Sequence, residues 1–323
     1  MEQHSKLGYS AVSTFENCPY QYKLRYIDKV EMLDEYEPTD ALKIGTALHR
    51  GIEVDTSTAI QEYYNSYTII TDAHITEAIK LETMIPKVKE VIPEGQHEVF
   101  FQYGAFKGTI DLLVPVDGTI HYDEVGNIDG FETDTYDIYD FKYSNNIDKY
   151  MESPQLHVYK YFSEKALNIK IRKLYFVFVQ KVQIRQKKTE DLNQFRLRLK
   201  NTLKDAQVQV KEVSYDASKV MDFMQNQVNI LTCTDYKKQP SRLCDWCEYK
   251  EYWEKNLATK IVEVGYMLSG NEIIPRFITG EEAEQEEVIE EKNPKVVAPS
   301  PLKKAMLNPK YTFDTFVIGK GNQ

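Results

Sequence analysis

The sequence lacks an apolar stretch long enough to span a bilayer, which requires about 18 consecutive residues. Its opening residues, MEQHSKLGYS, also lack the apolar run of a secretory signal. We therefore expect a cytoplasmic protein without a membrane partner. With 323 residues, 42% of them hydrophobic and 12% aromatic, the chain can form one large or two smaller globular domains.

Positive charge is in short supply, with 40 basic against 50 acidic residues and a formal net charge of −10. The chain thus lacks the cationic excess of proteins that coat nucleic acids. A nuclease is still compatible with this charge, because carboxylates that hold divalent ions count as negative while the bound ions are not counted.

Cysteines are also few, four in the whole chain, with two of them in Cys244-Asp-Trp-Cys247. This number does not resemble the disulfide framework of a small secreted domain, so ligation of a metal or cluster is the better interpretation. A G-x-x-x-x-G-K-S/T loop is missing as well, so the chain has no such loop to bind a triphosphate.

The first third is predicted to be mainly helical. Apolar residues recur at helical spacing, and Pro19 interrupts the first segment. The predicted helices cover Ser10 to Ile27, Leu42 to Ile52, and Thr58 to Val91, the last range holding two helices.

The middle of the chain changes to short β-branched or aromatic runs, which are typical of strands. Ser153-Pro154 predicts the start of a helix that runs to about Leu167. The predicted strands are His97 to Tyr103, Phe106 to Val114, Tyr136 to Tyr143 and the buried run Leu174 to Val179. Two more helices are predicted at Glu190 to Val213 and Ala217 to Leu231.

Two aspartates lie in strands whose neighbours favour burial. Asp111 is in Gly108-Thr-Ile-Asp-Leu-Leu-Val114 and Asp140 in Tyr136-Asp-Ile-Tyr-Asp-Phe-Lys-Tyr143. Burying an unpaired carboxylate is costly, so each should meet a cation. Structural ion pairs would satisfy that need equally well for an isolated aspartate.

Lys142 favours a catalytic interpretation. It is two residues from Asp140 in a strand, so both side chains project from one face, while Tyr139 and Phe141 point to the other. Two carboxylates can hold Mg²⁺ or Mn²⁺, and a nearby lysine can orient water or neutralise charge on a phosphate. These groups suit hydrolysis of a phosphodiester.

Two helical pairs agree with this site. Gln155 and Tyr159 are four residues apart just after the second strand, and Gly45 and His49 have the same spacing on an earlier helix. The glycine would leave room for a ligand or another backbone to approach His49.

In this order, Gly45-Thr-Ala-Leu-His49, Gly108-Thr-Ile-Asp111, Asp140-Phe-Lys142 and Gln155-Leu-His-Val-Tyr159 resemble the motifs of the PD-(D/E)XK nuclease superfamily. The similarity is to the branch with RecB-type nuclease domains, CRISPR-associated adaptation nucleases and phage exonucleases, and it covers about residues 8 to 255.

That resemblance implies roles for individual residues. His49, Asp111, Asp140 and the backbone carbonyl of Phe141 would be metal ligands. Lys142 would be the catalytic lysine, and Gln155 and Tyr159 would place it and the DNA. Glu98 matches a variable acidic position and ranks lower.

Cys18, Cys244 and Cys247 resemble the members of this branch that hold a 4Fe–4S cluster with one N-terminal and three C-terminal cysteines. Trp253 occupies the position expected for the last cysteine. Three alternatives follow from this pattern. Cys233 could supply the fourth thiolate, a ligand other than cysteine could complete a cluster held by three cysteines, or the cluster could be lost and replaced by aromatic packing.

Residues 307–323, LNPKYTFDTFVIGKGNQ, resemble the segment that opens the ATPase domain of the bacterial replication initiator DnaA. An aromatic segment on a disordered tether can fold on binding. The tail would be a docking peptide for the initiator or helicase-loading proteins, a remnant of a gene fusion, or a chance similarity.

The sequence thus predicts an α/β fold, with a mixed central sheet flanked by helices, a restriction-endonuclease-like core, and helical N- and C-terminal segments. We expect a nuclease domain at 1–264, an acidic flexible linker at 265–306 and the tail at 307–323. The expected activity is a metal-dependent DNA exonuclease of recombination, repair or phage DNA metabolism, with a structure-selective endonuclease second. The alternative is a protein-binding regulator of replication with a degenerate nuclease core.

Overall fold

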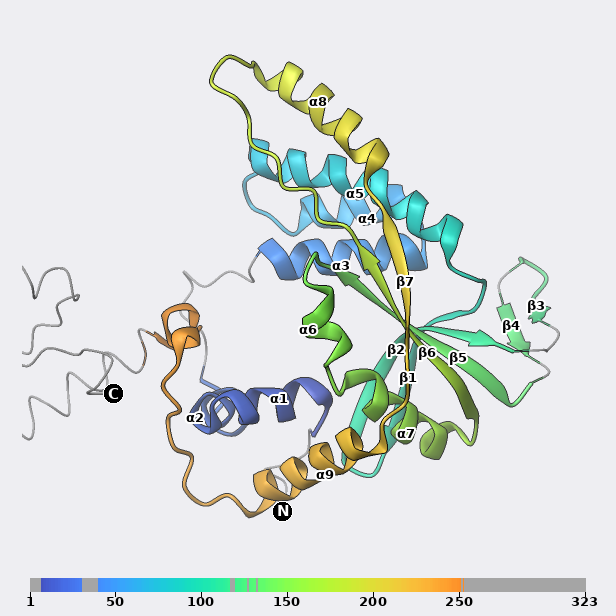
Figure 1. Ribbon diagram of the computed structural model, residues 1–323, viewed down its shortest axis with the longest axis vertical. Helices are drawn as coiled ribbons and strands as arrows, with labels where there is room; N and C mark the ends of the chain where they lie inside the picture. Colours follow the sequence, from blue (N-terminus) through green and yellow to red (C-terminus); the bar gives the residue numbers. More distant parts are fainter. Residues whose placement is uncertain are drawn as a thin grey trace, which may run out of the picture. The chain divides into compact units, whose positions relative to one another are not determined.

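The computed structural model describes residues 7–30, 40–116, 120–126, 128–131, 133–250 and 252. The chain divides into two compact units, residues 1–238 and 239–323. The first unit contains the sheet and its helices, shown in Figure 1. In the second, the described part holds one short 3₁₀ turn, η2 (Arg242–Trp246). No described helix is long and apolar enough to cross a membrane.

The N-terminal helices follow the prediction closely. The first predicted helix is α1 (Tyr9–Asn17), then α2 (Pro19–Tyr22) and the π-helical turn η1 (Lys23–Ile27). The break is at Cys18, whose backbone is extended, because Pro19 begins a new helix and disfavours a helical residue before it. The next three helices are α3 (Asp40–Glu53), α4 (Thr56–Asn65) and α5 (Asp72–Val91).

The central sheet is mixed, as predicted, with strand order β1-β2-β5-β6-β7. Within this sheet only the β5–β6 pair is parallel, and the chain between these two strands forms α6 (Ile147–Met151) and α7 (Gln155–Leu167). The strands are β1 (Gln96–Tyr103), β2 (Phe106–Pro115), β5 (Thr135–Tyr143), β6 (Lys170–Val179) and β7 (Val208–Val213). A separate hairpin of β3 (Ile120–Tyr122) and β4 (Ile128–Phe131) lies between β2 and β5 in the chain.

One predicted element is wrong in its second half. The helix expected over Glu190 to Val213 is α8 (Leu192–Asp205) followed by strand β7. The sequence Val208-Gln-Val-Lys-Glu-Val213 pairs antiparallel with β6 along its whole length. This pairing supplies the backbone of β7 with hydrogen-bond partners from β6. The helical prediction used only the local spacing of apolar residues, which contains no information on such partners.

Three helices complete the first unit. Residues after β5 form the short helix α6 (Ile147–Met151), which the sequence did not predict, and α7 (Gln155–Leu167). The helix α7 begins one residue later than predicted, with Pro154 and not Ser153 as its N-cap, although Ser153 Oγ accepts a hydrogen bond from the Gln155 N–H. The helix α9 (Ala217–Thr232) agrees with the prediction.

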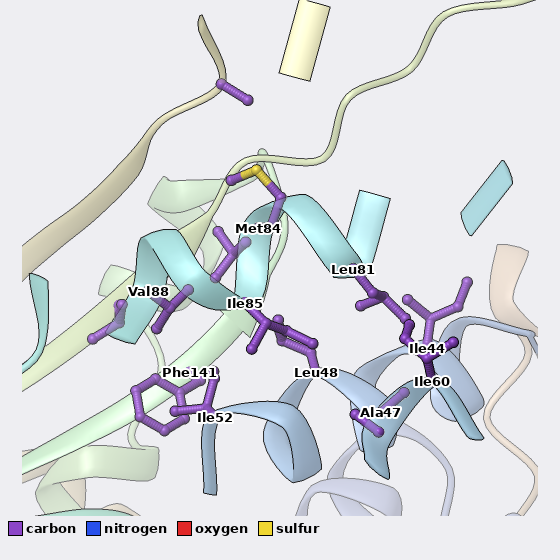
Figure 2. Close-up of a cluster of buried hydrophobic side chains, with 14 of the residues drawn as sticks. Ile44, Ala47, Leu48, Ile52, Ile60, Leu81, Met84, Ile85, Val88 and Phe141 are labelled. Carbon is purple, nitrogen blue, oxygen red and sulfur yellow. The ribbon is translucent and has the colours of Figure 1, made fainter. Parts of the chain in front are cut away.

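Helices cover both faces of the sheet (Figure 1). On one face α3, α4, α5 and α8 pack against alternate residues of the strands, including Tyr139 and Phe141. Figure 2 shows Phe141 beside Ile52 of α3 and the apolar side chains of α5 close by. On the other face α1, α7 and α9 pack against Ile138 and Phe176. Burial on both faces holds β5 firmly, so the polar side chains that it carries are held in place as well.

Candidate metal and phosphodiester site

The site begins where strands β2 and β5 separate. Their pairing covers residues 112–115 of β2 and 136–139 of β5. Beyond that point the Phe141 N–H donates a 2.8 Å hydrogen bond to Asp111 Oδ2 instead of to a strand carbonyl. The Asp111 carboxylate therefore lies in the fork between the two strands, beside the backbone that connects Asp140 to Lys142.

Asp140 and Lys142 lie on the same face of β5, as predicted. Asp140 is only 2% exposed, and Lys142 Nζ lies 2.5 Å from its Oδ2. Burial lowers the pKa of Lys142, but the charges of Asp140 and Asp111 outweigh burial and leave that pKa raised. The side chain is therefore an ammonium ion at neutral pH, in contact with the carboxylate of Asp140 and within the electrostatic reach of Asp111.

Burial also acts on Asp111. Burial, and after it the nearby charge of Asp140, raise the pKa of this carboxyl group, which comes to about 7. His49, Lys142 and the hydrogen bond from Phe141 act in the opposite direction without cancelling the rise. Two carboxylates that repel each other in a buried place favour a bound cation.

His49 reaches the fork from helix α3. Its Nδ1 lies 3.6 Å from Asp111 Oδ1 and 3.8 Å from Glu98 Oε1, while its Nε2 lies 3.3 Å from the Phe141 carbonyl oxygen. Burial lowers the pKa of His49, but Glu98, Asp111 and Asp140 together raise it above its ordinary value. The structure thus brings His49, Asp111, Asp140 and the Phe141 carbonyl together.

Glu98, which the sequence ranked low, is part of this cluster. His49, Glu98 and Asp111 each offer one ligand atom, and these atoms lie within 4.8 Å of one another. Glu98 has a left-handed backbone with φ of 50° inside strand β1, and its neighbours His97 and Val99 pair with Leu112 and Ile110, the residues on either side of Asp111. Such a conformation is costly for a residue with a side chain and is found where a site requires it.

Gln155 and Tyr159 lie on α7, close to Asp140. Burial raises the pKa of the Tyr159 hydroxyl, and the charge of Asp140 adds to this rise, while a hydrogen bond with Gln155 opposes it. The Tyr159 ring packs edge-on against Phe101. A methyl group at Gly108 would lie 3.4 Å from this ring and 2.9 Å from Phe101, so the glycine permits the close packing.

Two tyrosines near the site were missed in the sequence. Tyr9 of α1 shares a 2.9 Å hydrogen bond with Ser153, just before α7, and the charges of Lys142 and Asp140 both act on its hydroxyl. The ring centroid of Tyr150 in α6 lies 5.6 Å from Lys142 Nζ. Neither belongs to a short motif, so only the packing of α1 and α6 against the sheet indicates them.

A hollow of about 500 Å³ lies against the fork and is lined by Gly45, His49 and Glu98 among other residues of α3 and β1. No described atom lies within 4 Å of where a Cβ at Gly45 would be. Gly45 therefore leaves open space beside His49, as the sequence predicted.

None of the four cysteines, which all lie in the described part of the chain, forms a disulfide. In the first unit, Cys18 precedes α2, and Cys233 Sγ donates to the Asp235 carbonyl at the end of α9. Cys244 and Cys247 belong to the second unit, where Cys244 Sγ accepts from the Ser241 N–H. A cluster held by all four would need ligands from both units. Trp253 lies outside the described residues.

Known replication initiators share a short stretch with this chain. It is 54% identical over 78 residues to the chromosomal replication initiator protein DnaA of Enterococcus faecalis, covering 23% of this chain and 17% of that protein. The DnaA of Latilactobacillus sakei is 47% identical over 83 residues, with 18% of that protein covered. The chain thus spans less than a fifth of these relatives. The resemblance to DnaA is confirmed, and the match is longer than the segment 307–323, which lies outside the described residues.

The larger part of the chain has a different relationship. Residues 6–252 match the family model of the PD-(D/E)XK nuclease superfamily. This range covers all four predicted motifs, the whole central sheet and the fork between β2 and β5. The chain belongs to the PD-(D/E)XK nuclease superfamily.

Proposed function

We propose that this protein hydrolyses DNA phosphodiester bonds with the aid of Mg²⁺ or Mn²⁺. The observation that carries the proposal is the meeting of His49, Asp111 and Asp140 with Lys142 at the fork between β2 and β5. Membership of the nuclease superfamily supports it. The roles of the individual residues in metal binding and catalysis are part of the proposal.

The donors in the fork fit a divalent ion. Carboxylate and carbonyl oxygens suit Mg²⁺, and the additional imidazole nitrogen suits Mn²⁺. His49, Asp111 and Glu98 would hold the ion, with Asp140 and the Phe141 carbonyl next to them. When bound, such an ion lowers the pKa of water and polarises a phosphate.

The protein groups around the fork have separate tasks. The Lys142 ammonium donates a hydrogen bond to the attacking water or to a phosphate oxygen, where negative charge develops in the transition state. Asp140 keeps that ammonium in position at 2.5 Å. Tyr159 and Gln155 are positioning residues that hold this arrangement from α7.

We favour an exonuclease acting on DNA ends or single strands over an endonuclease, and we place its action in the cytoplasm, in recombination, repair or phage DNA metabolism. End-labelled single- and double-stranded DNA and a closed circular DNA would be incubated with Mg²⁺ or Mn²⁺. Release of short products from the linear DNA alone supports the exonuclease. Cleavage of the circle would instead establish an endonuclease.

Asp111→Asn tests the site itself. The amide oxygen can still accept the hydrogen bond from the Phe141 N–H, so the fork should stay folded while the carboxylate charge is lost. We expect metal-dependent cleavage to be abolished. Asp72→Asn, at an exposed position on α5, is the control. Cleavage by Asp111→Asn at the wild-type rate would refute the site.

A 4Fe–4S cluster on Cys18, Cys233, Cys244 and Cys247 is a separate proposal, suggested by the cysteine pattern alone. An anaerobic preparation would be brown, with absorbance near ~400 nm. Colourless, iron-free protein with full nuclease activity would exclude a required cluster.

The similarity to DnaA favours a second candidate function, a regulator of replication that binds the initiator or helicase-loading proteins. The proposed contact is residues 307–323, with its aromatic residues Tyr311, Phe313 and Phe316. We expect Phe313→Ala with Phe316→Ala to abolish binding to purified DnaA and to leave DNA cleavage unchanged. Wild-type protein that does not bind DnaA or its loading partners would eliminate this candidate.

A further inference from the structure

A polar hollow of about 450 Å³ lies on the same face of the sheet as Asp140 and Lys142. The strand register connects the two places. Lys142 pairs with Phe178 of β6, and Phe178 pairs with Gln209 of β7. Paired residues point to the same face, so these three form one row across the sheet. Two strand spacings separate Lys142 from Gln209, roughly 10 Å.

The next row contains mainly amides. Ser144 and Gln180 follow Lys142 and Phe178 by two residues, and Gln207 precedes Gln209 by two because β7 runs antiparallel to β6. The Gln180 N–H donates to the Gln207 carbonyl. Together with Asn145 and Gln209, these side chains form the rim of the hollow. The floor is apolar, formed by Phe178 and by Ile147 of α6.

The lining suits a nucleobase better than a phosphate. None of the lining residues that the structure describes is cationic, and Asp205 adds a negative charge. An amide both donates and accepts hydrogen bonds, as the edge of a base does, and an apolar floor suits the flat face of a base. The side-chain amides of Gln207 and Gln209 are exposed, and neither has a hydrogen-bond partner among the described residues.

We propose that this hollow binds the base of an unpaired nucleotide next to the scissile phosphate, with Gln207 and Gln209 as the residues that contact its edge. The proposal rests on the proposed nuclease function. A base in a duplex already uses its pairing edge, so the subsite selects single-stranded DNA. The ring of Tyr150, which lies 5.6 Å from Lys142 Nζ and 6.0 Å from Phe178, forms the link between the reacting phosphate and the base.

The test is a double-mutant cycle between protein and substrate. Gln207→Ala with Gln209→Ala would be compared with wild type on single-stranded oligonucleotides that are intact or abasic at one position, moved stepwise along the strand. On the intact strand we expect KM to rise about tenfold with kcat unchanged, the effect of one lost bidentate base contact. On the strand with the critical abasic position, the variant and wild type should share the same raised KM.

Gln61→Ala with Gln225→Ala, two exposed positions on α4 and α9, is the matched control, and thermal unfolding verifies that both double variants are folded. An unchanged KM in the Gln207/Gln209 variant overturns the subsite. A raised KM that persists on every abasic strand also overturns it, because the amides would then act on the backbone or the fold.

Binding of the same strands without divalent metal separates this proposal from the proposed function. Wild-type protein that binds the intact strand about tenfold more tightly than the abasic one, but never cleaves, supports the subsite and refutes the nuclease. Protein that cleaves but does not distinguish the two strands refutes the subsite alone. Protein that neither binds nor cleaves refutes both.

Discussion

Asp111 accepts a 2.8 Å hydrogen bond from the backbone N–H of Phe141, at the point where strands β2 and β5 stop pairing. This bond connects the Asp111 carboxylate to the backbone between Asp140 and Lys142. It also leaves the other Asp111 oxygen, Oδ1, facing His49 at 3.6 Å. Because β2 and β5 no longer form backbone hydrogen bonds with each other at this point, the charged side chains can converge between the two strands.

Replacing Lys142 by methionine should lower kcat for DNA cleavage about 100-fold or more, because the ammonium no longer meets charge on the phosphate. The variant should also be less stable, since the buried Asp140 loses its cation. Lys142→Met combined with Asp140→Asn removes both charges and should recover stability without recovering cleavage. Lys173→Ala, in an exposed ion pair with Glu212, is the control. Normal single-turnover rates in Lys142→Met would contradict the assigned role.

Glu98 is expected to lower the free energy of unfolding while it strengthens metal binding. Glu98→Gly should raise the free energy of unfolding by up to about 1 kcal/mol, because glycine adopts the positive φ without strain. The same change should weaken Mn²⁺ binding about tenfold, as should Glu98→Ala, which keeps the strain. Calorimetric Mn²⁺ titration and urea unfolding measure the two effects. Equal Mn²⁺ affinity in wild type and both variants would remove Glu98 from the site.

The two motif glycines should respond in opposite ways to alanine. Gly108→Ala places a methyl group 2.9 Å from the buried ring of Phe101, so we expect a loss of roughly 1–3 kcal/mol in unfolding free energy. Gly45→Ala fills open space on helix α3 and should gain about 0.5–1 kcal/mol. Its methyl group enters the hollow beside His49, so KM for DNA should rise. Thermal and chemical unfolding of both variants would show whether the signs differ.

Acid stability should depend on His157 of α7, a side chain that is 1% exposed. Burial lowers its pKa, Lys219 lowers it further and Asp216 opposes both. The proton is therefore bound more tightly in the unfolded chain, near pH 6.5, so stability is complete above that pH and is lost as pH falls. Between pH 6.5 and 5.5 the loss from this group is at most about 1.4 kcal/mol.

His157→Asn tests this dependence, because its amide oxygen can replace Nδ1 as the acceptor for the Asp216 N–H. Urea unfolding at pH 7.5 and 5.5 should show a smaller loss of stability in the variant than in wild type. An equal loss in both proteins would mean that other groups carry the acid sensitivity.

The two aspartates of β5 show how far the sequence could go. Asp137 and Asp140 both lie in Tyr136-Asp-Ile-Tyr-Asp140 and both are buried. Asp137 receives two hydrogen bonds from Arg172 of β6, so it forms the structural ion pair considered for an isolated aspartate. Asp140 faces Lys142 and Asp111. The motif Asp140-Phe-Lys142 singles out Asp140 as the candidate site residue, whereas the apolar neighbours of the two aspartates do not distinguish them.

Glu98 and the range Val208–Val213 show the opposite case. The strand β7 is defined by its pairing with β6, whose residues lie 29 to 39 positions earlier in the chain, and helical spacing over Glu190–Val213 does not carry that information. Glu98 joins the site because the pairing of its neighbours in β1 brings it beside Asp111, and its carboxylate lies 3.8 Å from His49 Nδ1. Both results depend on contacts between distant segments.

The sequence by itself determined the mixed α/β fold and most helices and strands, since periodicity is a local property. Its short motifs, through their resemblance to a nuclease family, singled out His49, Asp111, Asp140 and Lys142 as candidates. Tertiary structure alone decided how these residues meet. It separated β2 from β5, brought α3 over the fork and aligned Lys142, Phe178 and Gln209 in one row. Burial and strand register fix such distances, and both arise only when the sheet and its helices pack together.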